Sequence, residues 1–358
     1  MPSANERKGM VVQISMQLSY SGGFKEAADT VADLERAGLD LVWVAEAYGF
    51  DGASLMGYLA AKTETVQIAS GILPIYTRTP TLIAMTAAGV DALSDGRCHL
   101  GLGASGPQVI EGFHGVKYDA QLGRTREIIE ICRKVWARED KLTHDGRYYH
   151  LPLPEGEGTG LGKPLKIIAH PVRSRIPIWV ASLGPKNVAL TAEVADGWMP
   201  IFFDPAKADD VWGDDLAAGR AKRADDLDDL MITAGGMVAI GDDVKGFLDF
   251  VRPMVALYVG GMGARGRNFY NSLFQRYGYE AEAKEIQDLY LDGKKDEAAA
   301  AVPMEFLEAI SLVGPEGYVK ERLAAFDEAG VTHLNVIPVA TGDQTQASIV
   351  GQLKEWTS

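Results

Sequence analysis

The chain has 358 residues, of which 47% are hydrophobic and 23% charged, and its formal net charge is −14. This composition is that of an ordinary globular protein. The acidic balance and the lack of a basic run disfavour nucleic acid and anionic membranes as partners, so we expect a small-molecule substrate. The two cysteines, Cys98 and Cys132, lack metal-ligand spacing, which predicts packed thiols and no metal site.

The N-terminal stretch MPSANERKG lacks the apolar run of a signal peptide. No later run reaches the roughly 18 apolar residues that a membrane span needs. We therefore expect a cytoplasmic protein.

Strands and helices are predicted to alternate through the first third of the chain, at intervals of about 30 residues that suit right-handed parallel crossovers. The predicted strands are 10–18, 39–45, 66–71 and 97–102, and the helices are 24–37, 53–62 and 80–93. Gly38 is the expected stop of the first helix, and Pro80 suits the first turn of the third.

The rest of the chain continues the alternation with longer interruptions. Strands are predicted at 176–181, 197–203, 230–240 (with a bulge at its glycine pair) and 332–338, and helices at 122–138, 185–195, 204–224, 315–329 and 343–356. Asp145-Gly146 predicts a type I′ hairpin turn at 144–147. We predict an α/β fold, a (β/α)8 TIM barrel in one domain over 1–358, with an insertion loop at 151–171 and a helical excursion at 242–310.

In such a barrel, functional groups follow the carboxyl ends of the strands. One of these loops contains Gly101, Gly103 and Gly106, the letters of a dinucleotide-binding G-x-G-x-x-G motif. Three strand–helix units precede the motif, and its downstream region opens a helix instead of ending a strand at an acidic residue. We therefore expect these glycines to let the backbone approach a flat ring.

Four segments together resemble a known family. They read LVWVAEAY, SGILPIYTRTP, GLGASGPQVIEGFHG and ASLGPKNVALTAEVADGW, and they lie at strands two, three, four and five to six. The chain resembles the luciferase-like monooxygenase superfamily, and within it the oxidoreductases that use the deazaflavin coenzyme F420, relatives of the methylenetetrahydromethanopterin reductases.

The resemblance implies a cofactor site. It places a non-prolyl cis peptide at Gly71-Ile72 behind the deazaflavin ring, and it places Gly103, Ala104, Ser105 and Gly106 along the ring and ribityl chain. The phosphate is expected where a helix begins, at Ser182, Leu183, Gly184, Pro185 and Lys186. The histidine that many members carry after strand two is absent here.

The proton donor must therefore be sought among other residues. Glu46, His114 and Tyr76 are the candidate catalytic side chains. Glu46 follows an apolar strand, where burial would raise its pKa, but a structural carboxylate is an equally open reading. His114 is alternatively a satisfied helix-end histidine, and Glu111 is expected to be solvated. Arg78 is expected to pair with an acidic group of cofactor or substrate, or to cap the next helix.

The leading hypothesis is hydride transfer between coenzyme F420 and an unidentified organic substrate. The alternatives are an FMN-dependent monooxygenase on the same barrel and a barrel that only binds its ligand. The family also implies a homodimer built on the helices 53–62 and 80–93, although packing within the monomer explains their apolar faces equally well. Gly260–Gly263 and the insertion 151–171 are expected to wall the substrate side.

Overall fold

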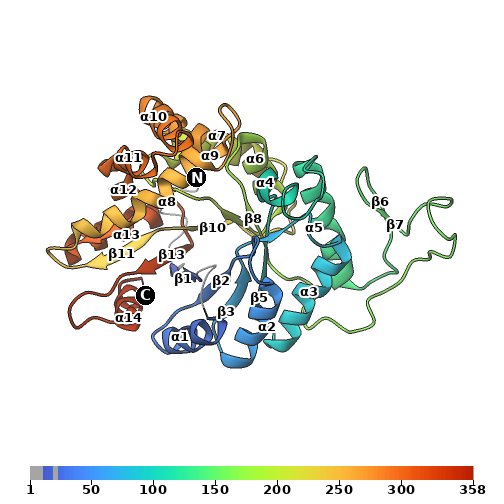
Figure 1. The fold of residues 1–358 in the computed structure, drawn as a ribbon. Helices are drawn as coiled ribbons and strands as arrows, with labels where there is room; N and C mark the ends of the chain where they lie inside the picture. The colour runs from blue at the N-terminus through green and yellow to red at the C-terminus, as the bar shows by residue number, and fades with distance from the viewer. Residues whose placement is uncertain (1–10, 19–22, 358) are drawn as a thin grey trace.

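The computed structural model describes residues 11–18 and 23–357. Its centre is a closed barrel of eight parallel strands, in which the last strand pairs with the first (Figure 1). In order, the strands are β1 (Gln13–Gln17), β2 (Leu41–Val44), β3 (Gln67–Ser70), β5 (Cys98–Gly103), β8 (Ile178–Ala181), β9 (Gly197–Met199), β10 (Met231–Ala234) and β13 (His333–Pro338). The predicted TIM barrel is confirmed.

Helices surround the barrel and follow its strands. They are α1 (Phe24–Arg36), α2 (Gly52–Lys62), α3 (Pro80–Leu93), α5 (Gln121–Ala137), α6 (Pro185–Val194), α7 (Ala208–Arg220), α13 (Glu316–Glu328) and α14 (Gln346–Trp356). Their ends follow local sequence signals. The Thr79 side chain caps α3 by accepting the Leu82 N–H, with Pro80 in the first turn. Gly38, at φ +102°, ends the turn after α1 as predicted.

The seventh predicted strand is broken at its glycine pair. It consists of β10 and β11 (Met237–Ile240), and β11 pairs with β13 and with β12 (Leu312–Gly314), a three-residue strand that we did not predict. A Cβ on Gly235 would lie 2.4 Å from the Asn335 carbonyl oxygen, and one on Gly236 would lie 2.1 Å from that of Ile310. Backbone therefore passes too close for any side chain here.

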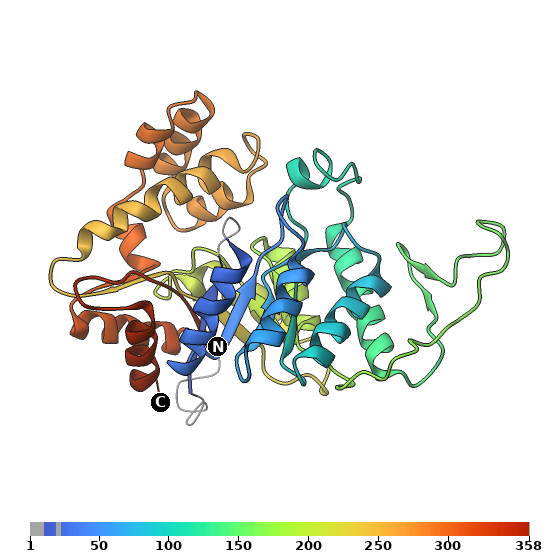
Figure 2. The same cartoon turned by 60° about the horizontal axis from the view of Figure 1, so that its bottom comes forward.

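A helical excursion stands on the carboxyl-terminal face of the barrel, because it follows the carboxyl end of β11. Its elements are η1 (Lys245–Val251), α8 (Arg252–Ala256), the π-helical turn η2 (Leu257–Gly261), α9 (Phe269–Arg276), α10 (Glu280–Leu291), α11 (Lys295–Ala300) and α12 (Met304–Ala309). Figure 2 shows this group rising on the same side of the barrel as α4 (Pro107–Ile110). That the whole chain forms one domain stays a prediction.

The insertion lies elsewhere. The hairpin β6 (His144–Asp145) and β7 (His150–Leu151) and the irregular segment 152–177 join the end of α5 to the start of β8. In both views this arm projects sideways from the barrel (Figures 1 and 2). The expectation that 151–171 walls the substrate side is wrong, since a helix-to-strand connection returns the chain to the amino ends of the strands.

The hairpin turn differs from the predicted type I′ geometry. Gly146 donates its N–H to the Tyr149 carbonyl, so the chain reverses at 147–148, and no residue of 145–148 has the positive φ that type I′ requires. The buried Glu127 carboxylate instead accepts the N–H groups of Arg147, Tyr148 and Tyr149 at 2.8 to 3.2 Å. A side chain of α5 therefore holds the turn.

The barrel interior is packed around two tryptophans. Trp43 and Trp179 are fully buried and meet edge to face, with ring centroids 5.1 Å apart. The Trp179 indole N–H donates to Nδ1 of His99 at 2.9 Å, and His333 packs edge-on against the same indole. Burial lowers the pKa of His99 to about 3 and that of His333 to about 4.

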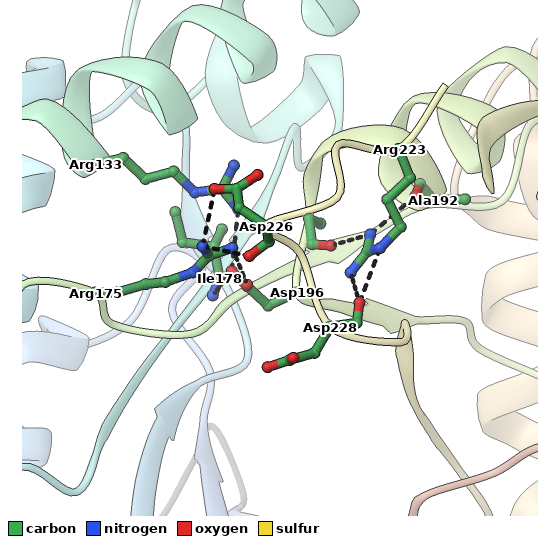
Figure 3. Close-up of polar contacts among 9 residues, drawn as sticks. Arg133, Arg175, Ile178, Ala192, Asp196, Arg223, Asp226 and Asp228 are labelled. Atoms are coloured by element: carbon green, nitrogen blue, oxygen red, sulfur yellow. Dashed lines mark hydrogen bonds and ion pairs between the residues drawn. The ribbon is translucent and has the colours of Figure 1, made fainter. Parts of the chain in front are cut away.

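Ion pairs tie the amino-terminal ends of β8 and β9 together (Figure 3). Asp196, directly before β9, accepts from Arg133 of α5, from Arg175 and from the N–H of Ile178 at 2.9 to 3.2 Å. This carboxylate therefore anchors a helix and two strands at the face opposite the carboxyl ends of the strands.

Candidate active site

The ring-binding segments predicted at strands three and four lie against each other. The structure has a cis peptide bond at Gly71-Ile72, as the resemblance implies. Gln17 donates to the Gly71 carbonyl at 3.2 Å, and the Glu46 N–H donates to the Ile72 carbonyl at 3.3 Å. A Cβ on Gly103 would lie 2.9 Å from Cγ1 of Ile72, so Ile72 packs directly on the bare Gly103 backbone.

Gln17 is a contact that the sequence reading missed. It follows Gln13 and Ser15 at alternate positions of β1, which all face the barrel interior with Trp43 and Trp179. The sequence did contain a signal for this contact. β1 alternates polar and apolar residues although both faces of a barrel strand are covered, which indicates a polar row that faces the interior.

Beyond β5 the chain rises through Ala104, Ser105 and Gly106 into α4. Ser105 has a left-handed backbone at φ +57°, and its carbonyl accepts the Tyr118 hydroxyl at 3.0 Å. A Cβ on Gly106 would meet one atom within 4 Å, the Gln108 side-chain oxygen at 3.4 Å. The backbone at Gly106 is therefore approachable.

The predicted phosphate turn lies at the start of α6. Gly184 is its N-cap, no side chain caps the helix, and a Cβ on Gly184 would meet nothing within 4 Å. Lys186 is exposed. The Ser182 hydroxyl is buried and bonded to the Thr191 hydroxyl at 2.8 Å, and the Leu183 carbonyl accepts the Trp212 indole N–H. Ser182 and Leu183 therefore support the turn, and the open positions are Gly184 and Lys186.

Glu46 is engaged in a nearly buried ion pair. Its carboxylate accepts from both terminal nitrogens of Arg78 at 2.5 and 2.8 Å, with side-chain exposures of 9% and 11%, and from the Gly52 N–H at 2.8 Å. Arg78 also bonds Asp51. The hydrogen bonds to Glu46 raise the pKa of the Arg78 guanidinium. This geometry favours the structural reading of Glu46. Arg78 pairs with Glu46 and with Asp51, the N-cap residue of α2, whereas the cap of the next helix, α3, is Thr79.

The other two candidates differ from each other. The Tyr76 hydroxyl donates to the Asp119 carbonyl at 2.6 Å, and burial raises its pKa, which makes it a poor acid at neutral pH. Nε2 of His114, in contrast, is buried and has no hydrogen-bond partner among the described residues. Glu111 is exposed, as expected, and its carboxylate accepts the Tyr118 N–H at 3.1 Å.

The fold therefore brings Ile72, Gly103 and the start of the loop at Glu46 together on the carboxyl-terminal face of the barrel.

A model of the luciferase-like monooxygenase family matches residues 10–333. The chain belongs to this family. A relative from Mycobacterium tuberculosis is 42% identical to this chain, over 94% of this chain and 97% of the relative. That relative is named provisionally as a coenzyme F420-dependent oxidoreductase.

Solved structures of other proteins share the fold. The coenzyme F420-dependent tetrahydromethanopterin reductase of Methanopyrus kandleri superposes with a TM-score of 0.76 at 21% identity, over 96% of this chain and 98% of that one. The FMN-bound oxygenating constituent of 3,6-diketocamphane monooxygenase from Pseudomonas putida gives 0.59 at 17% identity, over 91% of both chains. Among the described residues, no helix has the length and apolarity to cross a membrane.

Proposed function

We propose that this protein is a coenzyme F420-dependent oxidoreductase that transfers a hydride between the deazaflavin and an organic substrate. The 42% identical relative of that class carries the proposal. The place of Ile72 supports it, because its side chain lies on the bare Gly103 backbone at the carboxyl-terminal face, where the sites of such barrels lie. When bound, the coenzyme supplies or accepts the hydride.

The residues of this chain fit such a coenzyme. Ile72, Gly103 and Ala104 would line the ring, and Gly106 would leave room for the chain beyond it. The open N-terminus of α6 would hold a phosphate through backbone N–H groups and Lys186, since a helix N-terminus favours an anion. His114 would exchange the proton that accompanies hydride transfer, since its Nε2 is unpartnered.

Cofactor choice tests the proposal directly. We expect purified protein to bind F420 tightly by fluorescence titration, and to consume no oxygen with reduced FMN. Oxygen uptake with reduced FMN would favour the monooxygenase alternative and contradict the proposal. Binding of F420 with no oxidation of reduced F420 by a broad panel of ketones, enones and imines would favour a protein that only binds.

Two variants test the site. Lys186→Ala should weaken F420 binding roughly tenfold, the order expected for one charge-assisted contact to a phosphate, without changing the melting temperature. The exposed Lys320→Ala, paired with Glu316, is the matched control and should leave affinity unchanged. His114→Gln should lower the rate of hydride transfer at unchanged F420 affinity. Equal affinity in Lys186→Ala and wild type would contradict the phosphate assignment.

A cytoplasmic homodimer completes the proposal. The free, buried cysteines suit a reducing compartment. Leu82, Met85 and Leu93 of α3 stand exposed, and no atom would contact a Cβ on Gly89 of the same helix within 4 Å. Such an open apolar face suits a second copy. We expect twice the chain mass by light scattering and a shift to the monomer in Met85→Lys, with the exposed Met254→Lys as control.

A further inference from the structure

Three aromatic side chains stand exposed at the carboxyl-terminal face. Tyr48, Phe50 and Phe113 are 68%, 74% and 65% exposed, and together they are called the aromatic rim. Tyr48 and Phe50 follow β2, and Phe113 follows β5 and α4. Aromatic rings have the most apolar area to gain by burial, so an exposed group of them marks a binding surface.

Tyr48 and Phe113 join the two loops, while Phe50, two residues from Tyr48, packs on Phe24 at the start of α1. The rings of Tyr48 and Phe113 lie 6.1 Å apart, centroid to centroid, and Phe50 contacts Phe24 at 5.4 Å. The Phe113 ring in turn contacts His114 edge to face at 5.1 Å. The rim therefore leads to the imidazole whose Nε2 is buried and unpartnered.

The loop that displays Tyr48 and Phe50 is held at both ends. Arg78 bonds Glu46 at one end and Asp51 at the other. The Glu46 carboxylate also accepts the Gly52 N–H, and Asp51 caps α2 through Ser54 at 2.8 Å. Because the ends are fixed, the two rings are presented to solvent with little ordering left to occur on binding.

The loop that displays Phe113 is fixed as well. The Phe113 N–H donates to the Val109 carbonyl and the Val116 N–H to that of Ile110, both at 3.0 Å. The carboxylate of Glu111 accepts the Tyr118 N–H, which closes the loop on itself. Both halves of the rim are therefore preorganised.

The loops that follow β2, β3 and β5 carry few basic side chains, which favours a neutral ligand over an anion at these loops. In the loops 45–51, 71–79 and 104–120, which the structure describes in full, the basic residues other than His114 are Arg78 and Lys117. Arg78 is paired with Glu46, and Lys117 is paired with Asp119 at 2.9 Å. An anionic substrate would find no free lysine or arginine in these loops.

We infer that the aromatic rim binds the apolar body of an uncharged organic substrate, and that the substrate's polar reactive end faces His114. This inference rests on the proposed function for the identity of the site. It assigns Tyr48, Phe50 and Phe113 to substrate selection, a role apart from the positions that would hold the coenzyme.

A homologous ligand series tests the inference. We would titrate 2-butanone, 2-hexanone and 2-octanone into the F420-loaded protein and into the cofactor-free protein, and measure binding by calorimetry. Each added methylene should tighten binding roughly fourfold, the value for a buried CH2. Hexanoate and octanoate, of similar length but charged, should bind at least tenfold more weakly than the ketones.

Variants localise the effect. The triple variant Tyr48→Ser, Phe50→Ser, Phe113→Ser should reduce the gain per methylene to less than about twofold, at unchanged F420 affinity. Phe250→Ser, which removes a phenylalanine 70% exposed on η1, should retain the fourfold gain. Circular dichroism of the triple variant checks that it folds, and the single variants replace it if it does not.

Three results would overturn the inference: no chain-length dependence in the wild type, full dependence in the variants, or a change of molecular mass in the triple variant, which would make the rim a subunit contact. A wrong proposed function would give a different experimental result. There, F420 would not bind the wild type, while the ketone series in the cofactor-free protein would still report on the rim.

Discussion

At the scale of single residues, the nearly buried ion pair between Glu46 and Arg78 holds the loop that follows β2. Glu46 was singled out because it follows a buried strand, and it lies at the site face as predicted. Its partner Arg78 lies 32 residues further along the chain. At that separation the sequence does not show which side chains will pair. The role of Glu46 was therefore left open until the bidentate contact was seen.

The Glu46–Arg78 pair should be costly to break. We expect Arg78→Met to lower the free energy of unfolding by about 3 kcal/mol, because it leaves the nearly buried Glu46 carboxylate without its cation. Glu46→Gln should cost less, because Arg78 keeps its ion pair with Asp51. The double variant should cost less than the sum of the two, with a coupling of at least about 1 kcal/mol. Urea unfolding measures all three.

An exposed ion pair serves as the control. Lys284 is paired with Asp288 one helical turn away on α10 and is largely exposed. Lys284→Met should cost no more than about 0.5 kcal/mol. Strict additivity of Glu46→Gln and Arg78→Met would show that the two side chains do not depend on each other.

At the scale of elements, the positions of strands and helices followed from hydrophobic periodicity and from glycine and proline near their ends. Both ends of α3 were predicted correctly. Short elements were not predicted: β12 has three residues, too few for a period to show. β9 ends at Met199, before the predicted end at 203, and Phe202 beyond it takes a left-handed backbone that its residue type does not suggest. The fingerprint-like glycines of β5 were placed correctly, but the reason for Gly101 is steric and local.

Gly101 lies where β5 passes closest to β3. A Cβ there would lie 1.9 Å from the Ser70 carbonyl oxygen, and the Ser70 hydroxyl bridges the N–H and carbonyl of Gly101 at 2.8 Å. We expect Gly101→Ala to destabilise the fold by more than about 3 kcal/mol, since backbone must move. Gly317→Ala, in the open on α13, should instead stabilise by about 0.5 to 1 kcal/mol. Thermal melts compare them.

At the scale of the whole molecule, the barrel was predictable because the first four strands recur at intervals of about 30 residues and the strand–helix alternation then continues, past two long interruptions, to eight strands. What lies inside it was not, because the contents of a barrel depend on which strands face each other. His99 and Trp179, 80 residues apart, share a hydrogen bond in the interior. That pairing has a consequence for stability against acid.

We expect acid to destabilise the barrel through its interior histidines. Their folded pKa values, about 3 for His99 and about 4 for His333, lie below the ordinary 6.5. Between pH 6.5 and these folded pKa values, the two histidines therefore bind more protons in the unfolded chain than in the folded chain. The free energy of unfolding consequently decreases as the pH is lowered through this range. Each histidine contributes up to about 1.4 kcal/mol per pH unit.

His99→Gln measures this contribution, since a glutamine oxygen can still accept the Trp179 indole N–H. The variant should lose less stability than the wild type between pH 6.5 and pH 5 in urea unfolding. Parallel pH profiles for His99→Gln and wild type would contradict the assignment.

The anchoring of the hairpin turn by Glu127 bears on how this family can diverge. All three of its turn contacts are to backbone N–H groups, so the side chains of Arg147, Tyr148 and Tyr149 take no part in them. These turn contacts therefore persist with any residue except proline at 147–149, where Tyr148 and Tyr149 have separate side-chain contacts with Arg124, whereas position 127 needs a carboxylate. Among relatives that keep this arm, we expect a carboxylate at the position of Glu127 to be retained more often than the residue types at 147–149.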